Sequence, residues 1–258
     1  MRQFDRLVEI MAKLRAPGGC PWDAQQTHES LRPYLLEEAY EVLEAVDDAD
    51  PGRLCGELGD LLLQVVFHAE LAGERGDFDI ADVCRKICDK LEYRHPHVFG
   101  TVEVDGPDEV VTNWERLKRQ EAEHQERESA LDGVPRDLPA LQQADKLQKR
   151  AAKVGFDWQT IQGPLHKIEE ELREVQEAED PTEAAHEIGD LLFAVGNVAR
   201  FLKVDPESAL REANRRFSTR FRSVEKQAEG QGRKLADMTL EEMDVLWERA
   251  KAEERGEA

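Results

Sequence analysis

Five acidic residues lie in two short stretches whose other residues are largely apolar. They are Glu37, Glu38 and Glu41 in "LLEEAYE" and Glu57 and Asp60 in "GELGDLL". Their spacings of three and four place the acids of each stretch on one face of a helix. If the two helices lie antiparallel, the two acidic faces converge.

Clustered carboxylates repel one another, and burying an unpaired charge is very costly. The second stretch continues as "LLLQVVFHAELA", which predicts a helix that is apolar almost all round and therefore buried. Mg²⁺ would offset the repulsion, because it takes oxygen ligands, keeps several bound waters and commonly coordinates substrate phosphates as well as carboxylates. We therefore favour a magnesium site completed by a phosphate. A carboxylate outside the ligand set would orient or deprotonate the attacking water. The simpler alternative is a solvated Glu-rich surface.

The second half of the chain repeats this pattern. Its acids are Glu170, Glu171 and Glu174, followed by Glu187 and Asp190. Three further landmarks recur in the same order: "GCPWD" as "GFDW", Lys90 and Arg94 as Arg216 and Arg220, and Trp114 and Lys118 as Trp247 and Lys251. The offset stays between 126 and 136 residues, which predicts a duplicated lobe. A solvated surface has no reason to keep such spacing, so the repeat favours a site.

The basic and aromatic landmarks suit a phosphorylated ligand. Each pair of cations lies on one helical face, where it could contact phosphate oxygens. An exposed basic pair is also common without a ligand. Each Trp shares a face with a Lys, and its indole could stack on a nucleobase or ribose. Packing in a core is the ordinary role for such a Trp.

Helices must position all of these residues. Apolar residues recur at spacings of three and four, and no stretch shows sustained alternation typical of strands. We predict an all-α fold of two tandem helical-bundle lobes. Lobe one covers residues 1–125, a linker with Gly and Pro covers 126–140, and lobe two covers 141–258. Lobe one carries an insert at 93–107 that has no counterpart in lobe two and could cover its pocket.

Composition limits the classes of partner. The 258 residues carry a net charge of −21, which argues against a nucleic-acid polymer or an anionic membrane as the main partner. The longest apolar run is too short and too polar to span a bilayer, and the N-terminus lacks the apolar core of a signal peptide. The four cysteines make no disulfide framework. We expect a reduced, cytoplasmic protein.

At these residues the chain resembles the MazG family of nucleoside triphosphate pyrophosphohydrolases. The motifs that carry the resemblance are Glu-Glu-x-x-Glu followed by Glu-x-x-Asp, twice, with "GGCPWD", "HPHVFG" and "ANRRFSTRFRSVE". Nearly the whole chain is covered, and it resembles the two-lobed bacterial form. The resemblance implies an all-α homodimer with helices intertwined between subunits. It also implies Mg²⁺-dependent hydrolysis of a nucleoside triphosphate to monophosphate and pyrophosphate, a reaction that would clear non-standard or excess nucleotides.

The resemblance also implies roles for residues of lobe two, which is usually the catalytic lobe. Glu171, Glu174, Glu187 and Asp190 would hold the metal, with Glu170 beside them in a catalytic group of Glu170, Glu171 and Glu174. Arg216, Arg220, Trp247 and Lys251 would bind the nucleotide. Glu183 stands where relatives carry a basic residue that helps to bind nucleotide. Lobe one keeps the same residue types, so it stays open whether that lobe is active, regulatory or structural.

The sequence also suggests three other interpretations. A ferritin-like di-iron bundle needs Glu-x-x-His, but no such spacing falls at repeat-equivalent positions. A zinc site at Cys84, Cys88, His95 and His97 has no cysteine counterpart in lobe two. A non-catalytic helical scaffold that senses nucleotide or binds a partner remains the alternative of a different class, and release of pyrophosphate would distinguish it from an enzyme.

Overall fold

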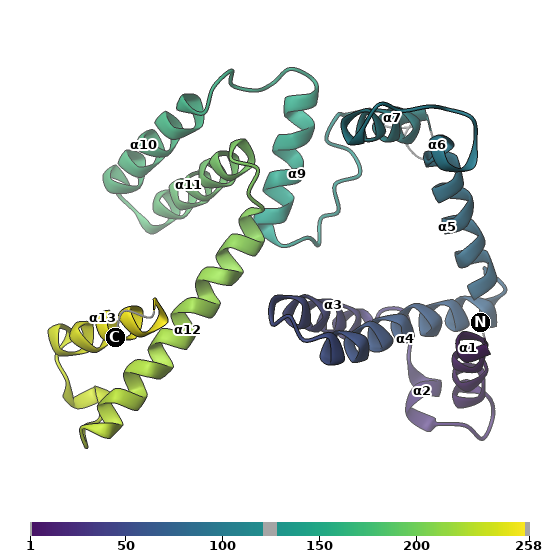
Figure 1. Ribbon diagram of the computed structural model, residues 1–258, viewed down its shortest axis with the longest axis horizontal. Helices are drawn as coiled ribbons and strands as arrows, with labels where there is room; N and C mark the ends of the chain where they lie inside the picture. Colours follow the sequence, from purple (N-terminus) through teal and green to yellow (C-terminus); the bar gives the residue numbers. More distant parts are fainter. Residues whose placement is uncertain (1, 121–127, 256–258) are drawn as a thin grey trace. The chain divides into compact units, whose positions relative to one another are not determined.

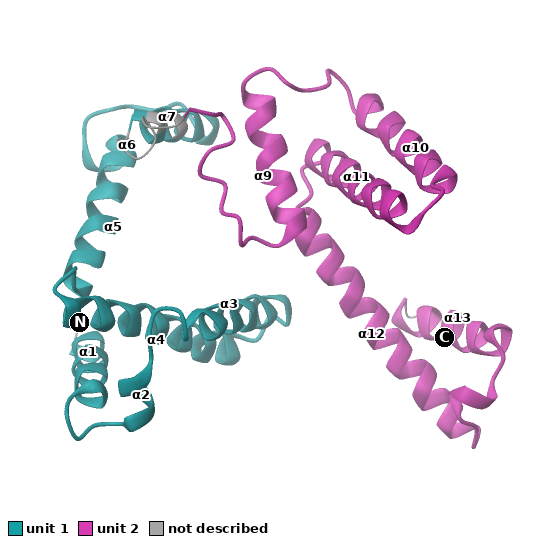
Figure 2. Ribbon diagram, turned by 180° about the vertical axis from the view of Figure 1, so that it is seen from behind, with its two compact units in different colours: residues 1–125 teal, residues 126–258 magenta. Residues whose placement is uncertain are grey.

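Helices form the whole regular structure of the described residues, 2–120 and 128–255, in this computed structural model (Figure 1). No strand occurs in those two ranges, and the predicted all-α fold class is confirmed. The chain divides into unit 1, Met1–Gln125, and unit 2, Glu126–Ala258 (Figure 2). Across the described ranges, every helix is too short or too polar to span a bilayer.

Unit 1 is built from seven helices in its described residues. They are α1 (Arg2–Arg15), α2 (Pro21–Gln25), α3 (Arg32–Asp47), α4 (Pro51–Arg75), α5 (Ile80–Arg94), α6 (Pro96–Phe99) and α7 (Pro107–Gln120). α3 and α4 form an antiparallel hairpin, and α1 packs against α4 (Figure 1). The helix α6 and the segment after it make up most of the insert at 93–107.

Unit 2 repeats the hairpin. Its helices are α9 (Ala140–Lys153), α10 (Gln162–Glu177), α11 (Pro181–Phe201), α12 (Pro206–Gly230), a short 3₁₀ helix (Leu235–Asp237) and α13 (Leu240–Glu254). α10 and α11 lie side by side, and α13 packs along the far part of α12 (Figure 1).

The same cap starts the second helix of both hairpins. The Asp50 side chain accepts the backbone N–H groups of Gly52 and Arg53 at 2.9 and 3.0 Å. Asp180 does the same for the first turn of α11. A proline follows each Asp, at a position where its missing N–H costs nothing. This Asp-Pro pair ends the turn and fixes where each second helix begins.

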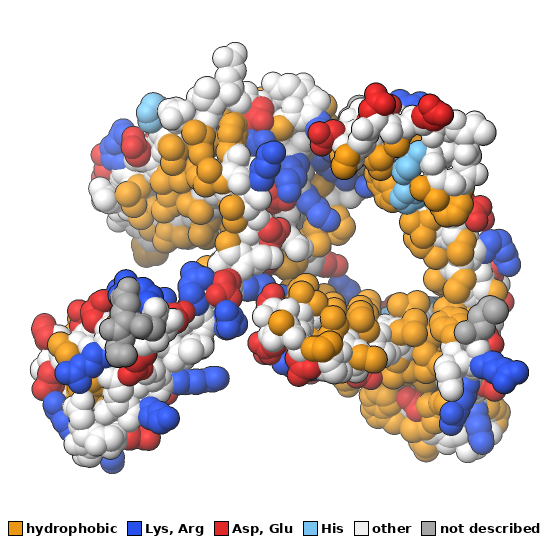
Figure 3. All heavy atoms as spheres, in the orientation of Figure 1, with side chains coloured by type: hydrophobic (Ala, Val, Ile, Leu, Met, Phe, Trp, Pro, Cys, Tyr) orange, Lys and Arg blue, Asp and Glu red, His pale blue; other side chains and the backbone are white. Residues whose placement is uncertain are grey.

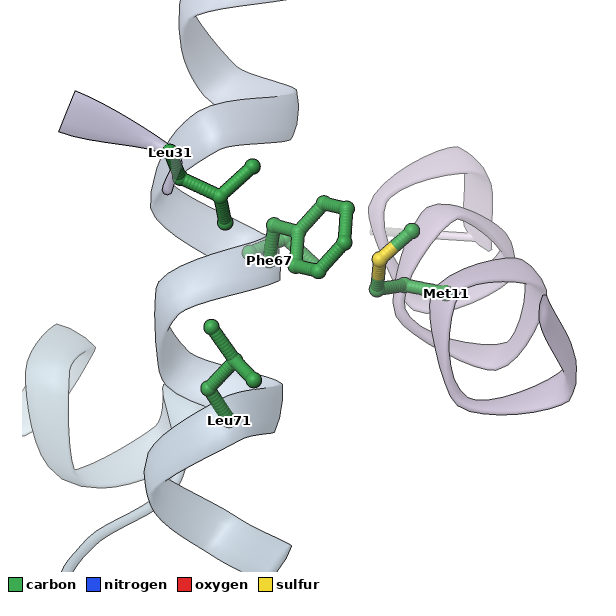
Figure 4. Packing of buried hydrophobic residues seen from close by; sticks show 5 residues of the cluster. Met11, Leu31, Phe67 and Leu71 are labelled. Carbon is green, nitrogen blue, oxygen red and sulfur yellow. The ribbon is translucent and has the colours of Figure 1, made fainter. Parts of the chain in front are cut away.

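Apolar packing holds the first helix of unit 1 to the hairpin. Met11 from α1, Leu31 just before α3, and Phe67 and Leu71 from α4 point toward one another (Figure 4). Their exposed fractions are 3% or less. In unit 2 a separate cluster joins α12 to α13 through Val224, Ala228, Leu246 and Ala250.

The expected burial of α4 on most sides is only half right. Its middle part from Val66 to Ala72 is mostly buried, but Leu58, Leu62 and Val65, nearer its N-terminus, are 49%, 39% and 39% exposed. Within unit 1, α3 lies against one side of this part of α4. The helix α4 therefore has more apolar side chains than the packing of a single chain buries.

Truncation of Leu31 should test the core of unit 1. Leu31→Ala leaves a cavity at a side chain that is 1% exposed, and we expect unfolding in urea, followed by circular dichroism, to lose about 2–5 kcal/mol. Leu240 is 75% exposed, so Leu240→Ala is the control and should change stability by no more than about 0.5 kcal/mol. Equal effects of the two substitutions would contradict this placement of the core.

Candidate active site

The hairpin of unit 2 brings three of the predicted acids together. One carboxylate oxygen from each of Glu171, Glu187 and Asp190 lies within 4.8 Å of the other two. Glu171 comes from α10, and the other two come from α11. The antiparallel hairpin therefore converts two short sequence motifs into one cluster with ligand atoms from both helices.

Glu171 is the buried member of this cluster. It is 3% exposed, and its Oε1 accepts a short ion pair from Lys167 Nζ at 2.5 Å. Its Oε2 is also buried and has no hydrogen-bond partner among the described residues. A buried carboxylate oxygen without a partner is costly. The donor set fits a hard divalent cation such as Mg²⁺, because it offers oxygen ligands only, and one of them is unsatisfied.

Glu174 and Glu170 border the cluster. Glu174 is exposed, but desolvation by its neighbours raises its pKa, and the negative charges of Glu171 and Glu187 raise it further. Glu170 is exposed, and its Oε1 accepts from Lys167 Nζ at 2.9 Å. Ion pairing with Glu171 and Glu170 raises the pKa of Lys167. The hairpin thus gathers all five predicted acids of unit 2 in one region.

Unit 1 forms a second acidic cluster. Single oxygens of Glu38, Glu41 and Glu57 lie within 4.8 Å of one another. Partial burial raises the pKa of Glu38, and Asp60, Glu41 and Glu37 add to the shift through their charge. Glu37 and Asp60 are exposed. This cluster contains no carboxylate as buried as Glu171.

The predicted nucleotide-binding residues of unit 2 form a separate group on α12 and α13. Arg220 lies over the Trp247 ring, with 5.9 Å from Cζ to the ring centroid. Arg216 and Arg220 pair with Glu212 and Glu254 at 3.3 and 2.7 Å, and Lys251 pairs with Glu248 at 2.7 Å. α13 packs along the far part of α12, away from the α10–α11 hairpin (Figure 1). Within one chain this group lies apart from the acids.

In unit 1 two of the corresponding residues, Arg94 and Trp114, pack together beside His95 of the insert. Arg94 is 9% exposed and lies over the Trp114 ring at 5.2 Å. The His95 ring meets Trp114 edge-on, with ring centroids 4.8 Å apart. Lys90 lines a shallow hollow of about 250 Å³ on α5, and Lys118 is exposed on α7. Trp247 is packed in a similar way, because Arg220 lies over its ring and the Phe217 ring lies 5.3 Å away between centroids.

The sequence interpretation missed two cations beside the acids. Lys167 lies four residues before Glu171, and Arg53 lies four residues before Glu57, where its Nε is 3.3 Å from Glu57 Oε1. Both spacings are those of an i, i+4 helical ion pair. Applying the spacing rule to the acids and their preceding turns together would have found both residues.

A hairpin with acidic faces on both helices, in two tandem copies, is the architecture of a helical nucleotide pyrophosphohydrolase. A family profile described as "MazG nucleotide pyrophosphohydrolase domain" matches residues 26–99, and one described as "Phosphoribosyl-ATP pyrophosphohydrolase" matches residues 140–217. The chain is 50% identical to the nucleoside triphosphate pyrophosphohydrolase/pyrophosphatase MazG of Thermotoga maritima, over 96% of this chain and 95% of that protein. It is 47% identical to the nucleoside triphosphate pyrophosphohydrolase of Escherichia coli K12, over 98% and 99%. The chain belongs to the MazG family.

Removal of one acid from the metal-free cluster should stabilise the protein. Because the pKa of Glu174 is raised in the folded state, its charged form disfavours folding at pH 7. Glu174→Gln should therefore raise the melting temperature in chelator at pH 7. The difference should shrink as the pH falls through about 4–5, where the carboxyl is protonated in both states. Glu169→Gln, on the same helix, is the control, and an equal rise with that variant would contradict repulsion within the cluster.

Proposed function

We propose that this chain hydrolyses nucleoside triphosphates to nucleoside monophosphate and pyrophosphate at the acidic cluster of unit 2, with Mg²⁺. The observation that carries this proposal is the unpartnered Oε2 of Glu171, buried beside Glu187 and Asp190. Membership of the MazG family and its named pyrophosphohydrolases supports the reaction. We expect it to act in the cytoplasm on small nucleotides and not on nucleic-acid polymers.

The side chains of unit 2 divide into roles by position. Glu171, Glu174, Glu187 and Asp190 would hold the metal. When bound, Mg²⁺ would neutralise phosphate charge and acidify a water molecule. Glu170 has an exposed carboxylate at the rim of the cluster, where it can orient the attacking water or accept its proton. Lys167 pairs with both Glu170 and Glu171, so its single positive charge offsets only part of their combined negative charge.

The residues that would bind the nucleotide support a dimer. Arg216, Arg220, Trp247 and Lys251 form one group on α12 and α13, apart from the acids of the same chain (Figure 1). A complete site needs phosphate-binding cations close to the metal ligands. We therefore propose a homodimer in which the partner subunit supplies the missing side of the site.

Exposed apolar surface on the hairpin of unit 2 also supports a homodimer. Hydrophobic side chains gather over α10 and α11 (Figure 3). On α11, Ile188, Leu192, Phe193 and Val195 are 44–49% exposed. Contiguous apolar patches on a soluble chain mark interaction sites. A second copy covering the hairpins would also supply the burial that the first half of α4 lacks.

Unit 1 is proposed to be structural or regulatory. Its Trp114 is packed against Arg94 and His95, so stacking of a nucleobase would require the insert to move. A non-catalytic nucleotide sensor is the alternative for the whole chain, and it would need no water-activating acids. A panel of nucleoside triphosphates with Mg²⁺, assayed for pyrophosphate against orthophosphate, separates the two.

Paired substitutions should assign the reaction to one unit. Glu171→Gln with Glu174→Gln removes two ligand charges at nearly constant volume, and we expect pyrophosphate release to fall by about a hundredfold or more. Asp190→Ala should have the same effect. Glu38→Gln with Glu41→Gln makes the matched change in unit 1 and should leave most of the activity. The opposite pattern would move catalysis to unit 1, and equal partial losses would mean that both units work.

Light scattering should give a mass near twice the 29.4 kDa of the chain at micromolar concentration. Leu192→Glu places a charge on the exposed face of α11 and should shift the protein toward monomer. Leu240→Glu changes an equally apolar side chain that is 75% exposed and should leave the mass unchanged. A monomeric mass for the unsubstituted protein would refute the dimer.

A further inference from the structure

The repeated landmarks "GCPWD" and "GFDW" belong neither to the acidic clusters nor to the groups of cations. Each lies in the segment that leads into the first helix of its hairpin, before α3 in unit 1 and before α10 in unit 2. This is the open end of the hairpin, because the short turns at 48–50 and 178–180 join the two helices only at the other end. Two helices joined at one end can move apart at the other unless contacts hold them together.

In unit 2, Asp157 of "GFDW" is connected to the last turn of α11. Arg200 Nη2 and Nη1 donate to the two carboxylate oxygens of Asp157 at 2.5 and 2.9 Å. The Arg200 side chain is only 12% exposed. Its Nε donates to Asn197 Oδ1 at 2.8 Å, and its guanidinium carbon lies 4.7 Å from the centroid of the Phe201 ring. The hydrogen bonds from Arg200 lower the pKa of Asp157. A two-pronged ion pair of this kind fixes direction as well as distance.

The next residue, Trp158, contacts the start of α10. Its indole lies against the backbone of Gly163, the second residue of that helix, where a Cβ would be only 2.1 Å from Cδ1 of the ring. Glycine is the residue that permits so close an approach. The backbone N–H of Trp158 also donates to Asp157 Oδ1 at 2.9 Å. Residues 157 and 158 therefore connect the start of α10 to the end of α11.

Unit 1 connects the same two helix ends with other contacts. The Trp22 ring meets the Tyr34 ring of α3 edge-on, with centroids 5.9 Å apart. The Asp23 carbonyl accepts from Arg15 Nη1. The same guanidinium donates to both carboxylate oxygens of Glu74, in the last turn of α4, at 2.6 and 2.8 Å. The second helix thus supplies the carboxylate of the ion pair in unit 1 and the arginine in unit 2.

The residues that make these ion pairs are not equivalent in the repeat. With the two Glu-x-x-Asp motifs aligned, Arg200 is matched by Glu70, and Glu74 is matched by Val204. Different side chains therefore make the same connection in the two units. This indicates that closing the open end matters to the hairpin more than any one contact.

We propose that "GFDW" and "GCPWD" are latches that close the open ends of the two hairpins, and that Asp157, Trp158 and Arg200 are positioning residues for the acids of unit 2. The inference rests on the proposed function only in taking those acids as metal ligands. The acids lie between the latch and the turn at 178–180. Both ends of the hairpin therefore set how closely the ligand oxygens of α10 and α11 approach one another.

The latch acts at a distance, through the helices. Glu171 lies eight residues after Gly163, and Asp190 lies ten residues before Arg200. These separations are about 12 and 15 Å along the helix axes. A change in the latch should therefore alter the geometry of the metal site without removing a ligand.

Binding of Mn²⁺ to the full chain tests this positioning role, with free Mn²⁺ counted by electron paramagnetic resonance. All variants carry Glu38→Gln with Glu41→Gln, so that the acids of unit 1 are not counted. Asp157→Asn keeps the side-chain volume and removes the charge that pairs with Arg200. We expect its Mn²⁺ affinity to fall by about tenfold or more, as when groups that orient metal ligands are removed, while helical circular dichroism stays the same.

Hydrogen exchange tests the latch itself, whether or not metal binds. In Asp157→Asn, exchange should become faster at amides in the second turn of α10 and the last two turns of α11. Arg200→Gln should have the same effects. Combining it with Asp157→Asn should add little, because both substitutions break one ion pair.

Gly163→Ala tests the contact with α10. Alanine is the stronger helix former, so a merely structural role predicts a gain in stability or no change. The latch instead predicts weaker Mn²⁺ binding, because the Trp158 ring must move away from the added methyl group. Gly230→Ala is the control, because a Cβ at that helical position meets open space, and it should leave the Mn²⁺ affinity unchanged.

Glu74→Gln separates positioning from a general loss of stability, because it breaks the ion pair of the unit 1 latch. It should lower the melting temperature as Asp157→Asn does, yet leave Mn²⁺ binding at unit 2 unchanged. Asp157→Glu keeps a carboxylate for Arg200 and should retain most of the Mn²⁺ affinity.

Two results would count against the proposal. Unchanged Mn²⁺ affinity in Asp157→Asn, or an equal loss in Glu74→Gln, would overturn the positioning role, and unchanged hydrogen exchange would overturn the latch. If Asp157→Asn does not fold, Gly163→Ala decides in the same way. Failure of the proposed function is seen separately, as absence of pyrophosphate release by the unsubstituted protein.

Discussion

The mutual repulsion of carboxylates that the hairpin forces together is the constraint on which the rest of the structure depends. Glu171 is 3% exposed, and partner acids from the facing helix have oxygens within 4.8 Å. Such an arrangement is unfavourable unless positive charge compensates it. The fold therefore needs rigid hairpins to hold the acids and cations to balance them. Asp caps start the second helices, and packing of α1 or α9 supports them from one side.

The two units meet this constraint with the same backbone and different side chains. Unit 1 balances its acids with an arginine that joins both helices, and unit 2 uses a lysine confined to one helix. In unit 1 the arginine pairs with Glu57, whereas in unit 2 the lysine leaves Oε2 of Glu171 without a hydrogen-bond partner. A duplicated hairpin can therefore carry one copy in which an arginine pairs with the second-helix Glu57 and another in which the buried Glu171 keeps one oxygen without a partner.

Much of the arrangement could be predicted from residue spacing. The three- and four-residue spacings placed the acids of each motif on one face, and the duplication indicated that this face had a role. Short turns before Pro51 and Pro181 reverse the chain, and two helices joined by such a short turn lie antiparallel. The positions of Arg53 and Lys167 could also have been found, because they are i, i+4 partners of acids already singled out. The all-α class followed from the same periodicity.

What could not be predicted depends on surfaces that are distant in the sequence. Leu58, Leu62 and Val65 predict a buried helix by composition, yet one chain leaves them exposed, because burial is decided by the total surface available and not by the helix itself. The same limit applies inside unit 2. There α9 meets α11 through small and polar residues, with Gln148 Nε2 donating to the Phe193 carbonyl at 2.7 Å, whereas α1 meets α4 through Met11 and Phe67. Helical periodicity marks both faces as interior but cannot say whether methyl groups or amides fill them. A directional bond crosses this interface in unit 1 as well, because Arg15 on α1 donates to both oxygens of Glu74 on α4 at 2.6 and 2.8 Å. Hydrogen bonds therefore help to fix the register of the second helix in both units, and in unit 2 that helix carries Glu187 and Asp190.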